Sequence, residues 1–199
     1  MAASKVYYEL KSNPKWRQLS EHRESRDIEA FDEELSRDFQ IGGADYRSGK
    51  KISYVLFQNR DDGSIRGLAH FGSHTAGNKG IVHGGASATM ADVAMGMLVW
   101  WTPGMNIFTG ELKLRYHQPM PTNTTVVVDA HFDTIEGRKH HLSATLSSLD
   151  PKRTDASTLD VMRPVSSSTI YLKATSIYFK MKPQEENGSS TRLKLQSKL

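Results

Sequence analysis

The sequence predicts an α+β fold in which a curved antiparallel sheet wraps around one long central helix. The long apolar segment at about 84–101 has no polar side when it is placed on a helix, and such a helix is buried on most sides. Other segments alternate apolar and polar residues, which is typical of strands with one buried face. Because a hairpin precedes the helix and a meander of strands follows it, we expect antiparallel pairing.

Each element follows from a local pattern. Residues 3–40 carry apolar side chains at roughly helical spacing with a break at Pro14, so we expect N-terminal helices there. The pair Asp62-Gly63, within a turn at 59–64, favours a hairpin between the first two strands. We expect a loop at 73–82, directly before the central helix. The predicted strands are 51–58, 65–72, 106–117, 124–135, 138–149 and 169–181.

A chain of 199 residues is enough for one domain with extensions. We expect an N-terminal helical extension at 1–45 and a single domain at 46–183. A polar stretch at 150–168, rich in Ser and Thr, predicts a mobile insertion loop within that domain. Residues 184–199 are polar, charged and rich in Ser, which predicts a disordered tail.

The composition excludes several classes of function. The net charge is +4, but Lys and Arg are scattered, so we do not predict nucleic-acid binding. The absence of cysteine excludes disulfides, thiolate metal sites and Cys nucleophiles. The longest apolar run, about 90–101, contains Asp92 and is shorter than the roughly 20 residues that cross a bilayer, so no membrane span is expected.

The two ends of the sequence bear on localisation. The N-terminus has no apolar core of a secretory signal and resembles no mitochondrial transit peptide. The last three residues, Ser197, Lys198 and Leu199, form the tripeptide that a peroxisomal import receptor recognises. We therefore expect a peroxisomal protein, with the cytoplasm or the mitochondrion as the alternative if the tripeptide is a chance match.

The start of the central helix carries the strongest chemical signal. Gly84 and Gly85 follow His83 where unpaired backbone N–H groups and a partial positive charge are expected. Such N–H groups can form an oxyanion hole that stabilises charge on an attacked carbonyl. Asp92, inside the apolar helix, could then activate water or act as the nucleophile. The structural alternative is a glycine turn followed by a hydrogen-bonded buried acid.

Helix geometry separates Asp92 from the glycine pair at the start of the helix. Asp92 lies seven residues after Gly85, on the same face but about 10 Å further along the axis. One carbonyl cannot readily contact both groups of one helix. A two-fold dimer with antiparallel helices side by side would bring Asp92 of one chain to Gly85 of the other. The sequence therefore predicts an isologous dimer with composite sites.

These residues also resemble a known family. The string 82-VHGGASATMAD-92 is similar to the motif of hotdog-fold acyl-CoA thioesterases of the phenylacetyl-CoA thioesterase type and of thioesterase superfamily members. The resemblance extends from about residue 50 to 183, without the insertion. It includes 136-EGRK-139, 174-ATSIYFK-180 and a strand motif formed by Thr109, Leu112, Leu114, Tyr116, Pro119 and Pro121.

The resemblance implies hydrolysis of fatty or aryl acyl-CoA to the free acid and CoA. It implies that the N–H of Gly85 polarises the thioester carbonyl while Asp92 of the partner chain activates water or attacks. His83 is expected to place the loop or contact the thioester, and Thr109 to help hold the water. It further implies a homodimer or a dimer of dimers that uses no metal and no cofactor, CoA being part of the substrate. The alternative is a non-catalytic acyl-CoA-binding or regulatory protein of the same fold.

Strict alternation would place Thr109 on the opposite face from Leu112 and Leu114. We therefore expect a β-bulge near Gly110, which would return Thr109 to the same face.

Substrate contacts are expected from Gly84 at the helix start and from basic residues that could meet the CoA phosphates: Lys79, Arg138 and Lys139. Ordinary surface charge is the alternative for those three. Asn78 is also a candidate, although many relatives have their Asn at the position occupied here by Gly77. The pairs His140-His141 and His70/His74 lack an acidic cluster beside them, so no metal site is predicted.

Overall fold

The computed structural model describes residues 2–19, 49–100, 107–149 and 168–181. Most of the expected N-terminal helical region, nearly all of the 150–168 insertion, and the tail therefore lie outside the described residues. The tripeptide Ser197-Lys198-Leu199 lies there too, and the peroxisomal address stays a prediction. None of the helices within the described ranges is both long and apolar enough to cross a membrane.

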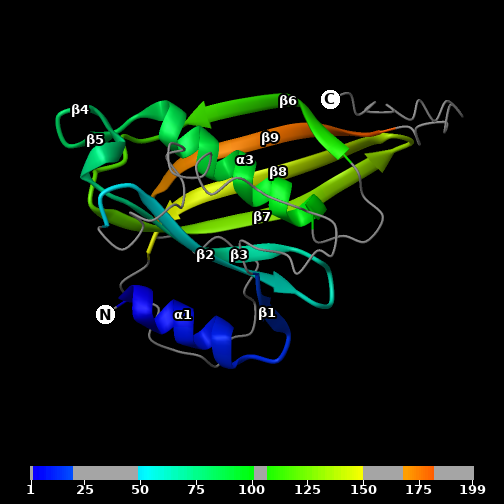
Figure 1. Ribbon diagram of the computed structural model, residues 1–199, viewed down its shortest axis with the longest axis horizontal. Helices are drawn as coiled ribbons and strands as arrows, with labels where there is room; N and C mark the ends of the chain where they lie inside the picture. The colour runs from blue at the N-terminus through cyan, green and yellow to red at the C-terminus, as the bar shows by residue number, and fades with distance from the viewer. Residues whose placement is uncertain (1, 20–48, 101–106, 150–167, 182–199) are drawn as a thin grey trace, which may run out of the picture.

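The described residues form one antiparallel sheet of seven strands curved around a helix, with a small hairpin beside it (Figure 1). The strand order is β1-β2-β3-β7-β8-β9-β6. The helices are α1 (Ala2–Ser12) and α3 (Gly84–Trp100), with a short 3-10 turn, η2 (Ser73–Thr75). The strands are β1 (Trp16–Gln18), β2 (Ile52–Asn59), β3 (Ile65–Phe71), β4 (Ala76–Asn78), β5 (Ile81–Val82), β6 (Ile107–Tyr116), β7 (Thr124–Glu136), β8 (Lys139–Ser148) and β9 (Ile170–Lys180).

Helix α3 packs one side against the concave face of the sheet, as the sequence predicted. Its fully buried residues on that side include Met90, Ala94 and Leu98. Along the other side, residues such as Thr89 and Val93 are only half-buried, and Trp100 is 47% exposed. In a single chain the apolar helix therefore keeps one partly uncovered stripe.

The strands that follow α3 alternate as predicted. Val126, Val128 and Ala130 of β7 are buried in the main core, whereas Asp129 and His131 point away from it. Strand β6 pairs with β9, and its register shifts between Thr109 and Glu111, so the bulge predicted near Gly110 is confirmed.

Two segments differ from the sequence prediction. Trp16–Gln18, expected to be helical, is the strand β1 and pairs with the end of β2. Pro14 interrupts the helix just before it, and a tryptophan suits a half-buried strand. Trp16 packs with Leu10 of α1 and Phe57 of β2 in a second small core, separate from the main one. The segment 73–82, expected to be a loop, contains η2 and the β4–β5 hairpin.

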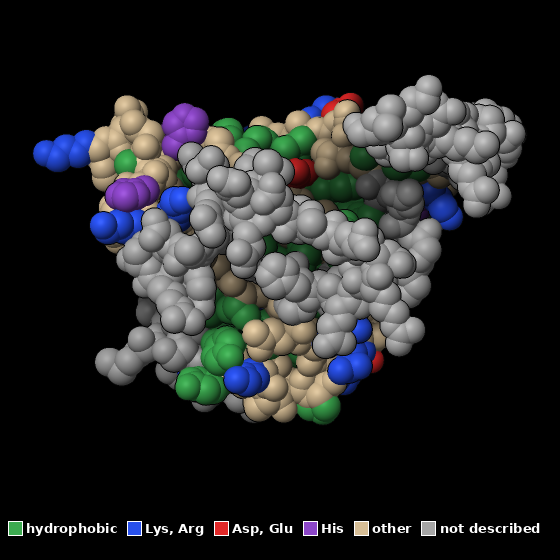
Figure 2. Space-filling view, viewed as in Figure 1, with side chains coloured by type: hydrophobic (Ala, Val, Ile, Leu, Met, Phe, Trp, Pro, Cys, Tyr) green, Lys and Arg blue, Asp and Glu red, His purple; other side chains and the backbone are tan. Residues whose placement is uncertain are grey.

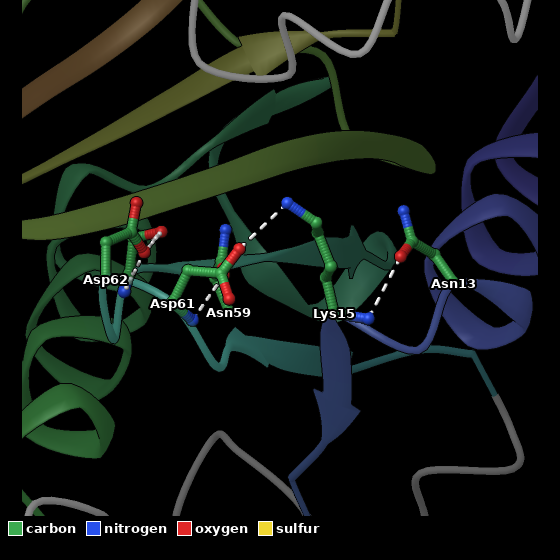
Figure 3. Close-up of polar contacts among 6 residues, drawn as sticks. Asn13, Lys15, Asn59, Asp61 and Asp62 are labelled. Atoms are coloured by element: carbon green, nitrogen blue, oxygen red, sulfur yellow. Dashed lines mark hydrogen bonds and ion pairs between the residues drawn. The ribbon is translucent and has the colours of Figure 1, made fainter.

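The hairpin at Asp62-Gly63 is confirmed, and polar contacts define its turn (Figure 3). The Asp61 N–H donates to the Oδ1 of Asn59, and the N–H and hydroxyl of Ser64 both donate to the Oδ1 of Asp62. Lys15 forms an ion pair with Asp61 over 2.9 Å. The turn between β2 and β3 is thereby tied to the link between α1 and β1.

Candidate active site

His83 caps the N-terminus of α3 with both its backbone and its side chain. Its carbonyl accepts hydrogen bonds from the N–H groups of Ala86 and Ser87 at the start of the helix. Its ring atom Nδ1 accepts the N–H of Gly85 over 2.9 Å. A backbone donor on Nδ1 places the proton of the neutral imidazole on Nε2. A Cβ at Gly85 would lie 2.9 Å from Nδ1, so a larger residue there would have to displace the exposed His83 ring.

The carbonyl of Gly84 is held by two hydroxyl groups. Tyr116 at the end of β6 donates to it over 2.9 Å, and Ser87 one turn along the helix donates over 3.0 Å. A Cβ at Gly84 would lie 3.1 Å from the Tyr116 hydroxyl oxygen. The peptide that joins Gly84 to Gly85 is therefore fixed at its carbonyl by Tyr116 and Ser87, and at its N–H by His83.

This arrangement bears on the oxyanion role expected for Gly85. Its N–H is already donated to His83, so it can reach a substrate carbonyl only if the His83 ring turns away. The N–H of Gly84 has no hydrogen-bond partner among the described residues. The helix start thus holds two adjacent donors: the N–H of Gly84, which has no partner among the described residues, and the N–H of Gly85, which the exposed His83 ring occupies.

Asp92 accepts hydrogen bonds from hydroxyl groups on two neighbouring strands. Thr109 of β6 donates to its Oδ1 over 3.2 Å, and Tyr178 of β9 lies 3.1 Å from the same atom. The bulge at Gly110 brings Thr109 to this side of β6. The structure therefore brings the predicted pair Asp92 and Thr109 together, and adds Tyr178. The acid is half-buried and lies on the partly uncovered stripe of α3.

Tyr178 was missed as a site residue, although it lies in the 174–180 segment that carried the resemblance. Spacing in the sequence could not indicate the contact, because 86 residues separate Tyr178 from Asp92. Burial raises the pKa of its hydroxyl above the ordinary value for tyrosine, and the carboxylate of Asp92 acts in the same direction. Tyr178 therefore remains protonated at neutral pH and can donate to Asp92.

The glycine pair and Asp92 remain apart within one chain. Both lie on α3 with seven residues between Gly85 and Asp92, so about 10 Å of helix axis separates them. The expected separation is therefore present, and one thioester carbonyl cannot contact both groups of the same chain.

The residues expected to contact the CoA phosphates lie at two ends of the molecule. Asn78 ends β4 and Lys79 follows in the turn of the β4–β5 hairpin; both are exposed near the N-terminus of α3. Arg138 and Lys139 lie at the turn after β7. Strand β7 starts beside Phe71 and runs about 40 Å to that turn, and Figure 1 shows the two turns at opposite ends of the sheet.

The basic side chains form no single patch on the face shown in Figure 2, where Lys and Arg are dispersed around the rim. Among the residues that the structure describes, no group of three or more His, Cys, Asp or Glu side chains could hold a metal ion.

A cavity of about 370 Å³ opens beside the helix start. Gly84, Ser87 and Tyr116 form one wall of it. The apolar part of its lining comprises Ile81, Val82, Pro119, Met120, Tyr171 and Leu172. Sequence patterns did not indicate this cavity, because its walls come from three separate segments of the chain, 81–87, 116–120 and 171–172.

Comparisons with known proteins agree with this architecture. Residues 79–154 match the model of the thioesterase superfamily. The chain is 29% identical over 161 residues to acyl-coenzyme A thioesterase THEM4 of Bos taurus, covering 81% of this chain and 60% of the bovine protein. It is 32% identical over 137 residues to THEM4 of Rattus norvegicus, covering 69% of this chain and 52% of the rat protein. The chain thus spans little more than half the length of these two relatives.

Solved structures with this architecture include thioesterase superfamily member 2 of zebrafish, with a TM-score of 0.52 and 11% identity over 75% of this chain and 93% of that one. A protein of Streptococcus mutans, solved bound to acetyl-CoA, has a TM-score of 0.52 and 14% identity, covering 82% of this chain and all of its own. At these identities the likeness establishes the fold alone.

Proposed function

Since its curved sheet and central helix form the hotdog fold of the thioesterase superfamily, we propose that this chain hydrolyses acyl-CoA thioesters. The reaction adds water across the thioester: the water oxygen bonds to the carbonyl carbon, the C–S bond breaks, and sulfur leaves as the protonated thiol of CoA. The products are the free acid and CoA.

The observation that carries the proposal is the surroundings of Asp92. A half-buried carboxylate receives the hydroxyls of Thr109 and Tyr178 at one oxygen, Oδ1. No hydrogen bond from the described residues reaches its other oxygen, Oδ2. That oxygen can accept a proton from water in general-base catalysis, or can attack the carbonyl carbon itself. Thr109 can in addition hold the water beside the carboxylate.

The second half of the site would come from a partner chain. Asp92 lies on the stripe of α3 that stays partly uncovered, beside small residues such as Gly96 that permit close approach. In a two-fold dimer with antiparallel helices, this stripe would meet its own copy and bring Asp92 to the partner's helix N-terminus. Each site would then combine the glycine pair of one chain with the acid of the other.

The thioester carbonyl would be polarised at that helix N-terminus. The N–H of Gly84 is available directly, and the N–H of Gly85 becomes available when the exposed His83 ring turns away. Both donors share the positive end of the α3 dipole, which favours the negative charge that develops on the carbonyl oxygen.

The CoA phosphates would lie near Lys79 of one chain in this arrangement. Because the helices of the proposed dimer are antiparallel, Arg138 and Lys139 of the partner would lie at the same end.

Release of free thiol from acyl-CoA tests the proposal. The panel should include short, medium, long and aryl acyl groups. Asp92→Asn is expected to bind these substrates like the wild type but to lower kcat by at least about 100-fold. Asp133→Asn is the matched control, since this exposed acid on β7 contacts Ser143 rather than the site. If the wild type binds acyl-CoA but releases no thiol across the panel, the chain is a non-catalytic acyl-CoA binder.

A further inference from the structure

We propose that Tyr116 is a positioning residue for the hydrolysis: through the carbonyl of Gly84 it holds the N–H groups that would polarise the thioester. This inference rests on the proposed thioesterase function and adds a residue to that same site. In this role Tyr116 needs no contact with the substrate, because it acts through the backbone of the helix start.

The contact joins the end of a strand to the start of the helix. Tyr116 is the last residue of β6, and its hydroxyl donates over 2.9 Å to the carbonyl of Gly84, 32 residues earlier in the chain. A Cβ at Gly84 would lie 3.1 Å from that hydroxyl oxygen and 3.3 Å from the ring carbon that bears it. The phenol therefore lies directly against the glycine, and a side chain at position 84 would press on it.

The helix does not need this hydroxyl for its own hydrogen bonds. In an α-helix that begins at Gly84, the carbonyl of that residue accepts the N–H of Ala88, four residues along. The hydroxyl of Ser87 already adds a second donor over 3.0 Å. Tyr116 is also 53% exposed, so its ring contributes less to the core than a buried tyrosine would. A further donor from another element at this carbonyl therefore points to a role beyond the stability of the helix.

The carbonyl of Gly84 controls both candidate donors. The peptide between Gly84 and Gly85 is planar, so holding its carbonyl also fixes the direction of the Gly85 N–H. A hydrogen bond to the carbonyl polarises the same peptide and strengthens that N–H as a donor. The N–H of Gly84 belongs to the residue that bears the carbonyl, and a glycine has no side chain to restrict its backbone. Tyr116 thus restricts the two N–H groups that would meet the developing negative charge.

Kinetics of Tyr116→Phe in the full chain test this role, since the variant loses one hydroxyl and keeps the ring that lines the cavity. Loss of an oxyanion donor itself lowers kcat about 100- to 1,000-fold, so a donor that is present but misplaced should cost about tenfold. KM and the Kd of free CoA should stay within about twofold of the wild type, because no substrate contact is lost. Tyr8→Phe, at an exposed tyrosine of α1, is the matched control and should change none of these values.

The amide proton signals of the glycines give a second readout that needs no catalysis. In protein labelled with ¹⁵N-glycine, Tyr116→Phe should shift the amide proton signal of Gly85 by more than that of Gly96, which lies further along the same helix. Ser87→Ala removes the other hydroxyl donor to the Gly84 carbonyl and should act in the same direction. Across Tyr116→Phe, Ser87→Ala and the double variant, kcat should fall in the order in which the Gly85 signal moves.

The outcomes separate this inference from the proposed function. If Tyr116→Phe hydrolyses acyl-CoA with the wild-type kcat, or if kcat falls only in proportion to the folded fraction in urea unfolding, the inference fails. If KM or the Kd of CoA rises at unchanged kcat, Tyr116 contacts the substrate itself, which also overturns the inference. An unmoved Gly85 signal would show that the hydroxyl does not act on that peptide. If the signal shifts but the wild type releases no thiol from acyl-CoA, the hold of Tyr116 on the peptide stands and the hydrolase proposal fails.

Discussion

The hydroxyl of Tyr178 lies 3.1 Å from the Oδ1 of Asp92 and 3.2 Å from the backbone carbonyl oxygen of the same residue. One phenol of β9 thus contacts both the side chain and the main chain of the acid on α3. This contact fixes the position of the helix over the sheet at the acid. It also orients the carboxylate, whose Oδ2 receives no hydrogen bond from the described residues.

Replacing Tyr178 with phenylalanine should misorient the acid while keeping the packing. We expect Tyr178→Phe to lower kcat about tenfold with little change in KM, because the lost contact acts on the acid and not on substrate binding. Loss of one buried hydrogen bond should lower the free energy of unfolding by about 1 kcal/mol. Steady-state kinetics and urea unfolding measure the two effects. Tyr7→Phe removes a hydroxyl of α1 that contacts Lys11, away from the site, and should keep the wild-type kcat; an equal loss there would show a general effect of removing a tyrosine hydroxyl.

The bulge in β6 depends on Gly110. A Cβ at this position would lie 2.3 Å from two ring carbons of Phe179 on the neighbouring strand. Gly110→Ala must therefore displace β6 or that ring, which stacks on Phe108. We expect a loss of about 1–3 kcal/mol in the free energy of unfolding. We also expect a fall in kcat, because Thr109 moves away from Asp92.

A second substitution separates crowding from other effects of losing the glycine. In Gly110→Ala/Phe179→Leu the obstructing ring is gone, so part of the stability and kcat should return. A double variant no better than Gly110→Ala would contradict the role given to the Phe179 contact.

A composite site predicts complementation between two inactive variants. Asp92→Asn lacks the acid, and Gly85→Val crowds the helix start, where a Cβ would lie 2.9 Å from Nδ1 of His83. After subunit exchange of equal amounts, half of the dimers are mixed and each has one intact site. The mixture should therefore recover roughly a quarter of wild-type activity. Mixed dimers that are present by native mass spectrometry but inactive would place both groups of a site in the same chain.

The burial of His140 predicts that the free energy of unfolding decreases as the pH falls. This residue of β8 is buried, and neither ring nitrogen has a hydrogen-bond partner in the described part of the chain. Burial lowers the pKa of His140 below its ordinary value of 6.5, and the nearby charge of Lys180 lowers it further. Below that ordinary value the unfolded chain takes up a proton that the folded chain resists, so the free energy of unfolding falls as pH falls.

Replacing His140 with phenylalanine removes this titration and keeps a ring beside Phe132, which His140 contacts edge to face. We expect the stability of His140→Phe relative to the wild type to increase between about pH 7.5 and pH 5. Urea unfolding at both pH values measures it. An unchanged difference between the two proteins would show that His140 takes up its proton equally in both states.

Local patterns predicted most of the fold because each element repeats a pattern over many residues. The apolar helix at 84–101 and the alternation through Val126 and Val128 needed no knowledge of their neighbours. The bulge at Gly110 followed from a conflict between the role that the resemblance implied for Thr109 and the alternation of the strand. Trp16–Gln18 was predicted wrongly because three residues form a strand only through their pairing with β2.

The candidate site was predictable only in part. His83, the glycine pair and Asp92 lie within ten residues of sequence, so the helix geometry alone defined their separation. Tyr178 and Tyr116 reach the site across the sheet, and their register could not be deduced from spacing. The capture of the Gly85 N–H by His83 was also not predictable, since it depends on the rotamer of one exposed side chain.

Strand β6 joins two contacts of the candidate site. Near its start Thr109 contacts Asp92, and at its end Tyr116 holds the carbonyl of Gly84. In the proposed dimer these two contacts serve different sites, because the acid of each chain acts at the glycine pair of the other. A displacement of β6 at one site of that dimer would therefore reach the second site, so the two sites would be coupled through one strand rather than independent.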